Sequence, residues 1–181
     1  MSVNITYFVH GTTADNENGL ASGWNDVELS PTGIAQAKKL GELVADKSFD
    51  IVFCSDLKRA FDSAQLAFGN KFRIIQDQRL REINYGDYNG QPNIFKNQMV
   101  DYINKQFPNG ESYKDVEKRM NDFLDFLRND YAGKNVAIVS HQGPQLALEV
   151  LLNKKTWEQA INQDWRNKKA WQPGWEYLLA A

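Results

Sequence analysis

The feature that most constrains the fold of this chain is an alternation between short apolar segments and longer segments with helical signals. The apolar segments are rich in β-forming residues and cover residues 3–9, 50–54, 72–76 and 135–140. The segments predicted to be helical cover residues 31–44, 55–68, 112–131 and 142–152. Strands that alternate with helices predict a three-layer α/β/α sandwich with a mostly parallel sheet. The alternative is an α+β fold with a smaller sheet.

Capping residues indicate where these helices begin. Ser30 is expected as an N-cap with Pro31 at the first helical position, and Ser55 or Asp56 is expected to cap the second helix.

Two stretches interrupt the alternation of strands and helices. Residues 11–29 are polar and predict a loop, whose length is more typical of a functional segment than of a connection. Residues 85–111 are rich in Gly, Asn, Pro and Tyr, with one helix near 93–106.

Length and composition exclude several classes of protein. The 181 residues predict a single domain over residues 1–181. No apolar run approaches the roughly 20 residues of a membrane span, and no signal peptide is visible, so we expect a cytoplasmic protein without a membrane partner. The net charge is −2 without a basic block, which argues against a nucleic-acid partner. The one cysteine, Cys54, lies in a predicted buried strand and is interpreted as a core residue.

The chemistry-bearing residues gather where predicted strands end. Both histidines of the chain, His10 and His141, directly follow an apolar strand. Arg59 follows the second strand and Glu82 follows the third. Because the carboxyl ends of parallel strands share one sheet edge, where α/β proteins bind ligands, these side chains are expected to form one site. The alternative is that the four residues are unrelated and structural.

Five blocks, in this order, resemble the histidine phosphatase superfamily, which includes the cofactor-dependent phosphoglycerate mutases. They are HG (10–11), LSPTG with QA (29–33 and 36–37), CSDLKRA (54–60), LRE with two glycines (80–82, 86 and 90) and VSH (139–141). The ordered set covers residues 3–145 and implies a phosphoglycerate mutase-like fold. No motif of the family is recognised beyond about residue 150.

The resemblance implies a mechanism without metal or cofactor. His10 matches the nucleophile that becomes phosphohistidine, and Glu82 matches the general acid that protonates the leaving oxygen. Arg59, His141 and Asn16 match residues that hold the phosphate. Donors around the transferred group are what phosphoryl transfer chiefly needs.

The loop after His10 is also expected to bind substrate. Gly11 and Thr12 follow the nucleophile directly, and Thr12 stands where the family commonly has an acidic residue. The family pattern is Arg-His-Gly, whereas this chain has Val9 before His10. A charge-assisted bond to phosphate is worth about 1.5–3 kcal/mol, so the phosphate pocket of this chain lacks one stabilising cation. Three basic residues are the candidates to replace that arginine: Arg79, Arg81 and Lys96.

These observations predict metal-independent hydrolysis of a small phosphorylated metabolite through a phosphohistidine at His10. The alternative is a weakened or inactive relative that binds a phosphorylated ligand or a protein partner, which Val9 favours. A phosphoglycerate-type mutase ranks third, because the short insert at 85–111 leaves the pocket open to water.

The C-terminal part of the chain carries four of the five tryptophans, at positions 157, 165, 171 and 175. Tryptophan favours packed covers and interfaces. The favoured interpretation is that this segment folds back over the core. The alternatives are a homodimer surface or one wall of the substrate pocket.

Overall fold

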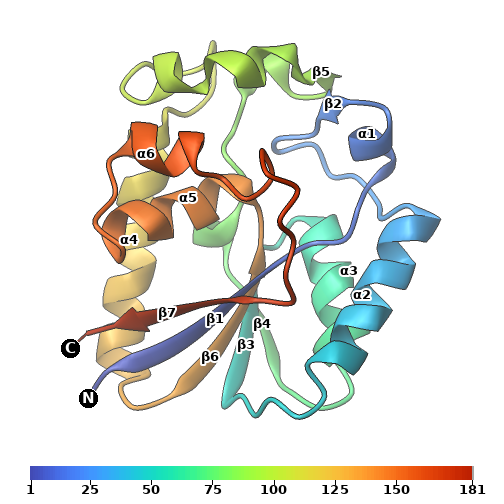
Figure 1. Ribbon diagram of the computed structural model, residues 1–181, viewed down its shortest axis with the longest axis vertical. Helices are drawn as coiled ribbons and strands as arrows, with labels where there is room; N and C mark the ends of the chain where they lie inside the picture. Colours follow the sequence, from blue (N-terminus) through green and yellow to red (C-terminus); the bar gives the residue numbers. More distant parts are fainter. Residues whose placement is uncertain (181) are drawn as a thin grey trace.

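The computed structural model describes residues 1–180 and shows a five-stranded sheet with helices on both faces (Figure 1). The strand order is β4-β3-β6-β1-β7. The first four strands of this order pair in parallel, and β7 pairs antiparallel with β1. The predicted α/β sandwich with a mostly parallel sheet is therefore confirmed.

The strands of the main sheet are β1 (Val3–Val9), β3 (Ile51–Cys54), β4 (Ile74–Gln76), β6 (Asn135–Ser140) and β7 (Trp175–Leu179). The α-helices are α1 (Ala14–Glu17), α2 (Pro31–Leu43), α3 (Lys58–Phe68), α4 (Tyr113–Asp130), α5 (Gln142–Leu151) and α6 (Trp157–Asn162). The 3₁₀ helices are η1 (Gln78–Leu80), η2 (Gly86–Tyr88) and η3 (Asn93–Tyr102). A second, two-stranded sheet joins β2 (Leu20–Ala21) to β5 (Gln91–Pro92).

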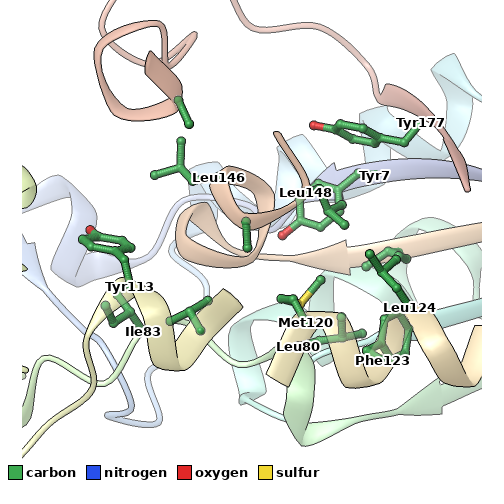
Figure 2. Packing of buried hydrophobic residues seen from close by; sticks show 14 of the residues in the cluster. Tyr7, Leu80, Ile83, Tyr113, Met120, Phe123, Leu124, Leu146, Leu148 and Tyr177 are labelled. Carbon is green, nitrogen blue, oxygen red and sulfur yellow. The ribbon is translucent and has the colours of Figure 1, made fainter. Parts of the chain in front are cut away.

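Each face of the sheet has its own apolar core, because successive strand residues point to opposite faces. On one face, Phe8, Val52 and Val139 pack in a cluster with residues of α2 and α3. On the other face, Tyr7 and Ile138 join the larger cluster that α4 and α5 cover, part of which is drawn in Figure 2. The carboxyl ends of the parallel strands point toward the top of Figure 1.

The predicted helix starts are confirmed at two positions and wrong at a third. Ser30 accepts the backbone N–H of Gly33 and caps α2. Ser112 likewise caps α4. Neither Ser55 nor Asp56 caps α3, because the N-cap is Leu57, which has no side-chain capping bond. The Asp26 carboxylate accepts the first helical N–H, that of Lys58, at 2.7 Å.

The two irregular stretches contain more structure than predicted. The segment 11–29 holds the short helix α1 and the strand β2, which pairs with β5 of the second stretch. The helix expected near 93–106 is the 3₁₀ helix η3. In Figure 1 these elements lie together above the carboxyl end of the sheet. The local patterns failed here because the pairing joins residues about 70 positions apart, which periodicity does not register.

The C-terminal segment does fold back over the core, as the favoured interpretation had it. Trp157 lies in the larger core cluster, and β7 covers the outer edge of β1. The strand β7 itself was not predicted. Cys54 is buried, as expected, and burial raises the pKa of its thiol to about 12. Within residues 1–180, no helix combines the length and the apolar character needed to cross a membrane.

Candidate active site

The register of two neighbouring strands brings the two histidines together. Val9, the last residue of β1, pairs with Ser140, the last residue of β6. The next residue on each strand is a histidine, and the backbone N–H of His10 donates to the Ser140 carbonyl at 3.1 Å. The ring centroids of His10 and His141 are therefore only 4.9 Å apart.

The tautomer of His10 is set by its own loop. Its Nδ1 lies 2.7 Å from the carbonyl oxygen of Gly11. A carbonyl can only accept, so Nδ1 carries the proton and Nε2 keeps its lone pair. Burial, and after it the positive charge of Arg59, lower the pKa of His10 to about 3. At neutral pH this side chain is thus an uncharged imidazole with a free nucleophilic nitrogen.

His141 is buried with unused hydrogen-bonding capacity. The residue is 1% exposed, and within residues 1–180 neither of its ring nitrogens has a hydrogen-bond partner. Burial first, and then the charge of Arg59, hold the pKa of His141 well below its usual range. A buried polar group without a partner costs about 1–3 kcal/mol. Both ring nitrogens of His141 are therefore available to bond to a group that enters the site from outside.

The loop that follows His10 is fixed by close backbone contacts. A Cβ on Gly11 would lie 2.4 Å from the carbonyl oxygen of Gly33, and one on Gly33 would lie 2.0 Å from that of Thr12. The Thr12 backbone N–H and hydroxyl both donate to the side-chain oxygen of Gln36, at 2.9 and 3.0 Å. The Gly11 N–H donates to the Ser63 hydroxyl at 3.0 Å. The glycines and Gln36 therefore hold the loop after His10 against α2.

Arg59 lies in α3, with only 2% of its surface exposed. Its guanidinium donates to the carbonyl oxygens of Asn25 (3.0 Å) and Gly23 (2.7 Å). No carboxylate appears among these partners. Its charge therefore acts on the two histidines, whose pKa values it lowers, and favours an anion beside them.

Glu82 follows η1, and its carboxylate binds the N-terminus of α5 next to His141. Its Oε1 accepts the backbone N–H groups of Ile83 (2.9 Å) and Gly143 (2.7 Å), and its Oε2 accepts that of Gln142 at 3.2 Å. The residue is 7% exposed. Since the N-cap residue His141 makes no side-chain capping bond, the carboxylate of Glu82 occupies that role. A Cβ on Gly143 would lie 2.7 Å from Glu82 Oε1, so a larger residue there would displace the carboxylate.

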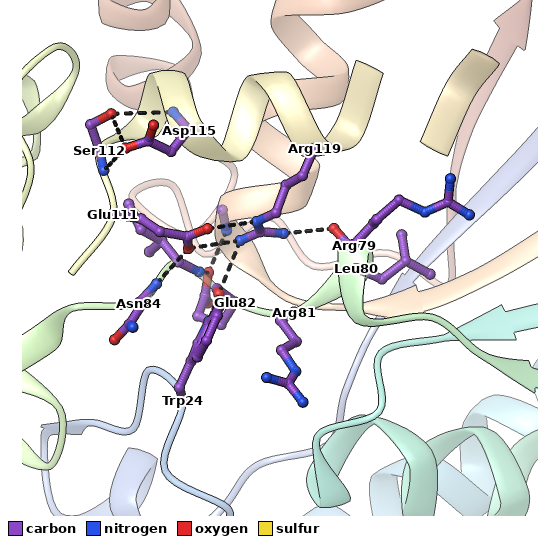
Figure 3. A network of polar contacts seen from close by, with 12 residues as sticks. Trp24, Arg79, Leu80, Arg81, Glu82, Asn84, Glu111, Ser112, Asp115 and Arg119 are labelled. Atoms are coloured by element: carbon purple, nitrogen blue, oxygen red, sulfur yellow. Dashed lines mark hydrogen bonds and ion pairs between the residues drawn. The ribbon is translucent and has the colours of Figure 1, made fainter. Parts of the chain in front are cut away.

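Side chains from distant segments also hold the backbone of Glu82 (Figure 3). Its carbonyl oxygen accepts the indole N–H of Trp24 at 2.7 Å and a guanidinium N–H of Arg119 at 3.1 Å. Arg119 also pairs with Glu111 at 2.9 Å and donates to the Arg79 carbonyl at 2.6 Å. This network fixes the main chain from which the carboxylate projects.

A cavity of about 280 Å³ lies over these groups. Its lining consists of Val9, His10, Thr12, Asn16, Glu82, Lys96, His141, Gln142, Trp165 and Arg166. A larger, mainly apolar cavity of about 690 Å³ adjoins it between α2 and the C-terminal segment, and shares Val9, His10, Thr12 and Trp165. The uncharged histidines, one carboxylate and several cations suit an anionic group with an apolar or polar substituent.

A model of the histidine phosphatase superfamily (branch 1) matches residues 7–171. The chain belongs to the histidine phosphatase superfamily. It is 30% identical over 178 residues to a 2,3-bisphosphoglycerate-dependent phosphoglycerate mutase of Rhizobium meliloti, covering 89% of this chain and 84% of the mutase. It is 28% identical over 156 residues to phosphoserine phosphatase 1 of Hydrogenobacter thermophilus, covering 81% and 74% of the two chains.

A solved structure confirms the relationship at the level of fold. The alpha-ribazole phosphatase from Shigella flexneri superposes with a TM-score of 0.75 and 28% identity, covering 90% of this chain and 84% of that one. The family resemblance and the phosphoglycerate mutase-like fold predicted from the sequence are therefore confirmed. The individual site residues stay predictions.

The structure brings most of the predicted site residues of this histidine phosphatase to one place. His10, Thr12, Asn16, Glu82 and His141 line the cavity. The side-chain oxygen of Asn16 accepts the Thr13 N–H at 3.1 Å, so its amide N–H₂ group is the part left for a ligand. Arg59 stands behind the histidines, and Gly11 contributes its backbone.

Two of the three predicted replacement cations lie elsewhere. Arg81 donates both ends of its guanidinium to Asp56, at 2.8 and 2.6 Å, and stacks on Trp24 at 4.9 Å. Arg79 is paired with Asp77 against α4. Neither is among the residues that line the cavity. Lys96 does line it.

Sequence reasoning missed Gln142 and Arg166, which also line the cavity, whereas Trp165 lines it as one alternative for the C-terminal tryptophans had it. Gln142 could have been found, because it follows a strand-end histidine and begins a helix. Trp165 and Arg166 lie beyond the last recognised motif, and no local pattern marks Arg166. Only the path of the chain after α6 brings them to the strand ends.

Proposed function

We propose that this chain hydrolyses small phosphomonoesters through a phosphohistidine intermediate at His10. The observation that carries the proposal is the pair of uncharged histidines at adjacent strand ends, of which His141 is buried and His10 is partly buried. One has Nδ1 held by a carbonyl, which leaves Nε2 free, and the other has both ring nitrogens unused within residues 1–180. A phosphoryl group beside them would accept from His141 and receive the lone pair of His10.

In the first step, His10 Nε2 attacks phosphorus and the bond from phosphorus to the leaving oxygen breaks. The carboxylic acid form of Glu82 gives its proton to that oxygen, so the alcohol leaves neutral. Arg59 and the amide of Asn16 offset the charge on the transferred group. Glu82 Oε2 accepts one long backbone bond whereas Oε1 accepts two, so Oε2 is the oxygen assigned to proton transfer.

In the second step, the Glu82 carboxylate takes a proton from water as the water oxygen attacks phosphorus. The bond from phosphorus to Nε2 breaks, inorganic phosphate leaves, and Glu82 again holds its proton. His10 returns as a neutral imidazole. Neither step needs an electron donor or a metal, and the lowered pKa of His10 keeps it unprotonated for the next turnover.

The test is phosphate release from a generic aryl phosphate at pH 5 to 8, with no added metal. The native chain is compared with His10→Ala and with Glu82→Gln. We expect loss of turnover in His10→Ala and a decrease of about 10²–10⁴-fold in Glu82→Gln, the usual contribution of a general acid. Acid-labile incorporation of phosphate from labelled substrate should disappear in His10→Ala. Turnover that survives in His10→Ala would sink the proposal.

Val9 favours a second candidate, a relative that binds a phosphorylated ligand or protein without turning it over. It predicts phosphate binding with no release from any substrate, and rescue of turnover by Val9→Arg. A phosphoglycerate-type mutase is the third candidate and predicts an isomerised sugar phosphate in place of free phosphate. Product analysis by ³¹P NMR separates the three in one experiment.

A further inference from the structure

We propose that Arg166, in the C-terminal segment, donates to the phosphoryl group at His10 and supplies the cationic contact that Val9 does not make. The inference rests on the proposed function for the identity of the ligand. Arg166 follows α6, where the chain turns back across the sheet toward β7 (Figure 1). It lines the same cavity as Val9, His10 and His141.

The guanidinium of Arg166 is held in place by side chains around it. It donates to Asp164 Oδ1 at 3.0 Å and to the side-chain oxygen of Gln145 at 3.2 Å. Its central carbon lies 4.4 Å from the ring centroid of Trp165. The indole N–H of Trp165 donates to the same Gln145 oxygen at 3.0 Å, and its ring stacks on Trp175 of β7. A cation held this way loses little freedom on meeting an anion.

Arg166 keeps donors for a ligand. An arginine has five N–H donors, and its hydrogen bonds within residues 1–180 use two of them. Its partner carboxylate, Asp164, also accepts from the side chain of Gln142, which lines the cavity. The positive charge of Arg166 is among the causes that lower the pKa values of both His10 and His141, so the charge acts where the phosphoryl group would sit.

Lys96, in η3, is the competing cation, because it lines the same cavity. It lies 5.8 Å from the ring centroid of Tyr85, and burial lowers its pKa. A lysine is a single flexible point charge, whereas arginine offers a planar fork that matches two phosphate oxygens and stays protonated. The fixed geometry of Arg166 therefore favours it as the phosphate ligand.

The experiment measures the dissociation constant of inorganic phosphate by titration calorimetry. The native chain is compared with Arg166→Met, Arg166→Lys, Lys96→Met and the matched surface control Arg128→Met, whose arginine pairs with Asp125. We expect binding about 10- to 100-fold weaker in Arg166→Met, partly restored in Arg166→Lys and unchanged in Arg128→Met. Native affinity in Arg166→Met with a loss only in Lys96→Met would overturn the assignment to Arg166.

A second comparison tests whether Arg166 replaces the cation absent at position 9. Val9→Arg is introduced into the native chain and into Arg166→Met. We expect it to restore most of the lost phosphate affinity in Arg166→Met and to add less in the native chain. Equal effects in both backgrounds would mean that the two positions act separately, and that would overturn the replacement.

Removing Arg166 strips the partner from the buried Asp164, so thermal unfolding is measured for every variant. The double variant Asp164→Asn/Arg166→Met removes both charges and keeps the test valid if the single variant unfolds. The two proposals fail separately. If the chain turns over substrate but its phosphate affinity does not depend on Arg166, only this inference is wrong. If phosphate binding depends on Arg166 but neither turnover nor phosphohistidine is found, only the proposed hydrolysis is wrong.

Discussion

The two walls of the cavity are built in different ways. The wall at residues 10–13 is held by backbone: glycines in close contact, backbone N–H groups and a carbonyl that sets the tautomer of His10. The wall at residues 164–166 is held by side chains, through one carboxylate, one amide and stacked indoles. A wall held by backbone contacts tolerates few residue types, so it leaves motifs in the sequence. A wall held by side chains can be made from many combinations and leaves none.

The largest effect is expected from breaking the backbone wall. In Gly33→Ala the new Cβ would meet the Thr12 carbonyl oxygen at 2.0 Å, and backbone cannot move aside as a flexible side chain can. We expect a loss of about 3 kcal/mol in the free energy of unfolding, and a decrease of about 10²-fold in turnover as His10 shifts. Chemical denaturation and aryl phosphate kinetics measure the two.

The matched control is Gly19→Ala, in the segment 11–29 that precedes α2, where a Cβ would meet nothing within 4 Å. Gly19 has a φ of 69°, so alanine should cost only about 1–2 kcal/mol for the left-handed conformation. Its turnover should stay near the native value. Similar losses of turnover in the two variants would contradict the role given to the contact between Gly33 and Thr12.

The same contrast explains what the sequence could predict. The ordered strands and helices placed His10, His141, Arg59 and Glu82 at one sheet edge, because parallel strands end together. The short motifs around them contain residues that close contacts require, such as Gly11 and Gly33, where a Cβ would meet backbone atoms.

The supports of Glu82 and the far wall could not be predicted. Trp24 and Arg119 reach the carbonyl of Glu82 from segments 58 and 37 positions away. Arg166 depends on how the chain turns after α6. These contacts follow from tertiary packing, which neither periodicity nor spacing encodes.

A smaller effect is expected from loosening the side-chain wall. Asp164→Asn keeps the size of the side chain and removes the charge that orients Arg166. We expect KM for an aryl phosphate to rise about tenfold, with kcat changed less, because the cation is still present but less fixed. A decrease in kcat with unchanged KM would show that Asp164 acts on the chemistry instead of on the position of Arg166.

Lowering the pH tests the backbone wall, because it protonates His10 while Arg166 stays charged. The pKa of His10 is about 3 in the folded chain and about 6.5 when it is free, so on acidification the unfolded chain takes up the proton first. The free energy of unfolding should therefore fall as pH drops from about 6.5 toward 3. The free energy of unfolding should change by at most about 1.4 kcal/mol per pH unit, and by less here because water reaches part of the His10 ring.

The measurement is denaturation at pH 7, 6, 5 and 4 for the native chain and for His10→Gln. Carboxylates contribute alike to both chains, so the difference between the two curves isolates the histidine. The native chain should lose more stability over this range than His10→Gln. Parallel curves would mean that His10 titrates normally in the folded chain and is not held neutral.

The smallest effect is expected from Arg81→Ala, although Arg81 stands next to Glu82 in the sequence. Its guanidinium binds Asp56 and lies over the ring of Trp24, and Arg81 is not among the residues that line the cavity. We expect unchanged phosphate affinity and a loss of about 1 kcal/mol or less in the free energy of unfolding, as for other partly exposed ion pairs. Weaker phosphate binding in this variant would mean that Arg81 supplies one of the cationic contacts of the cavity. The role given to the side-chain wall would then need to be divided between Arg81 and Arg166.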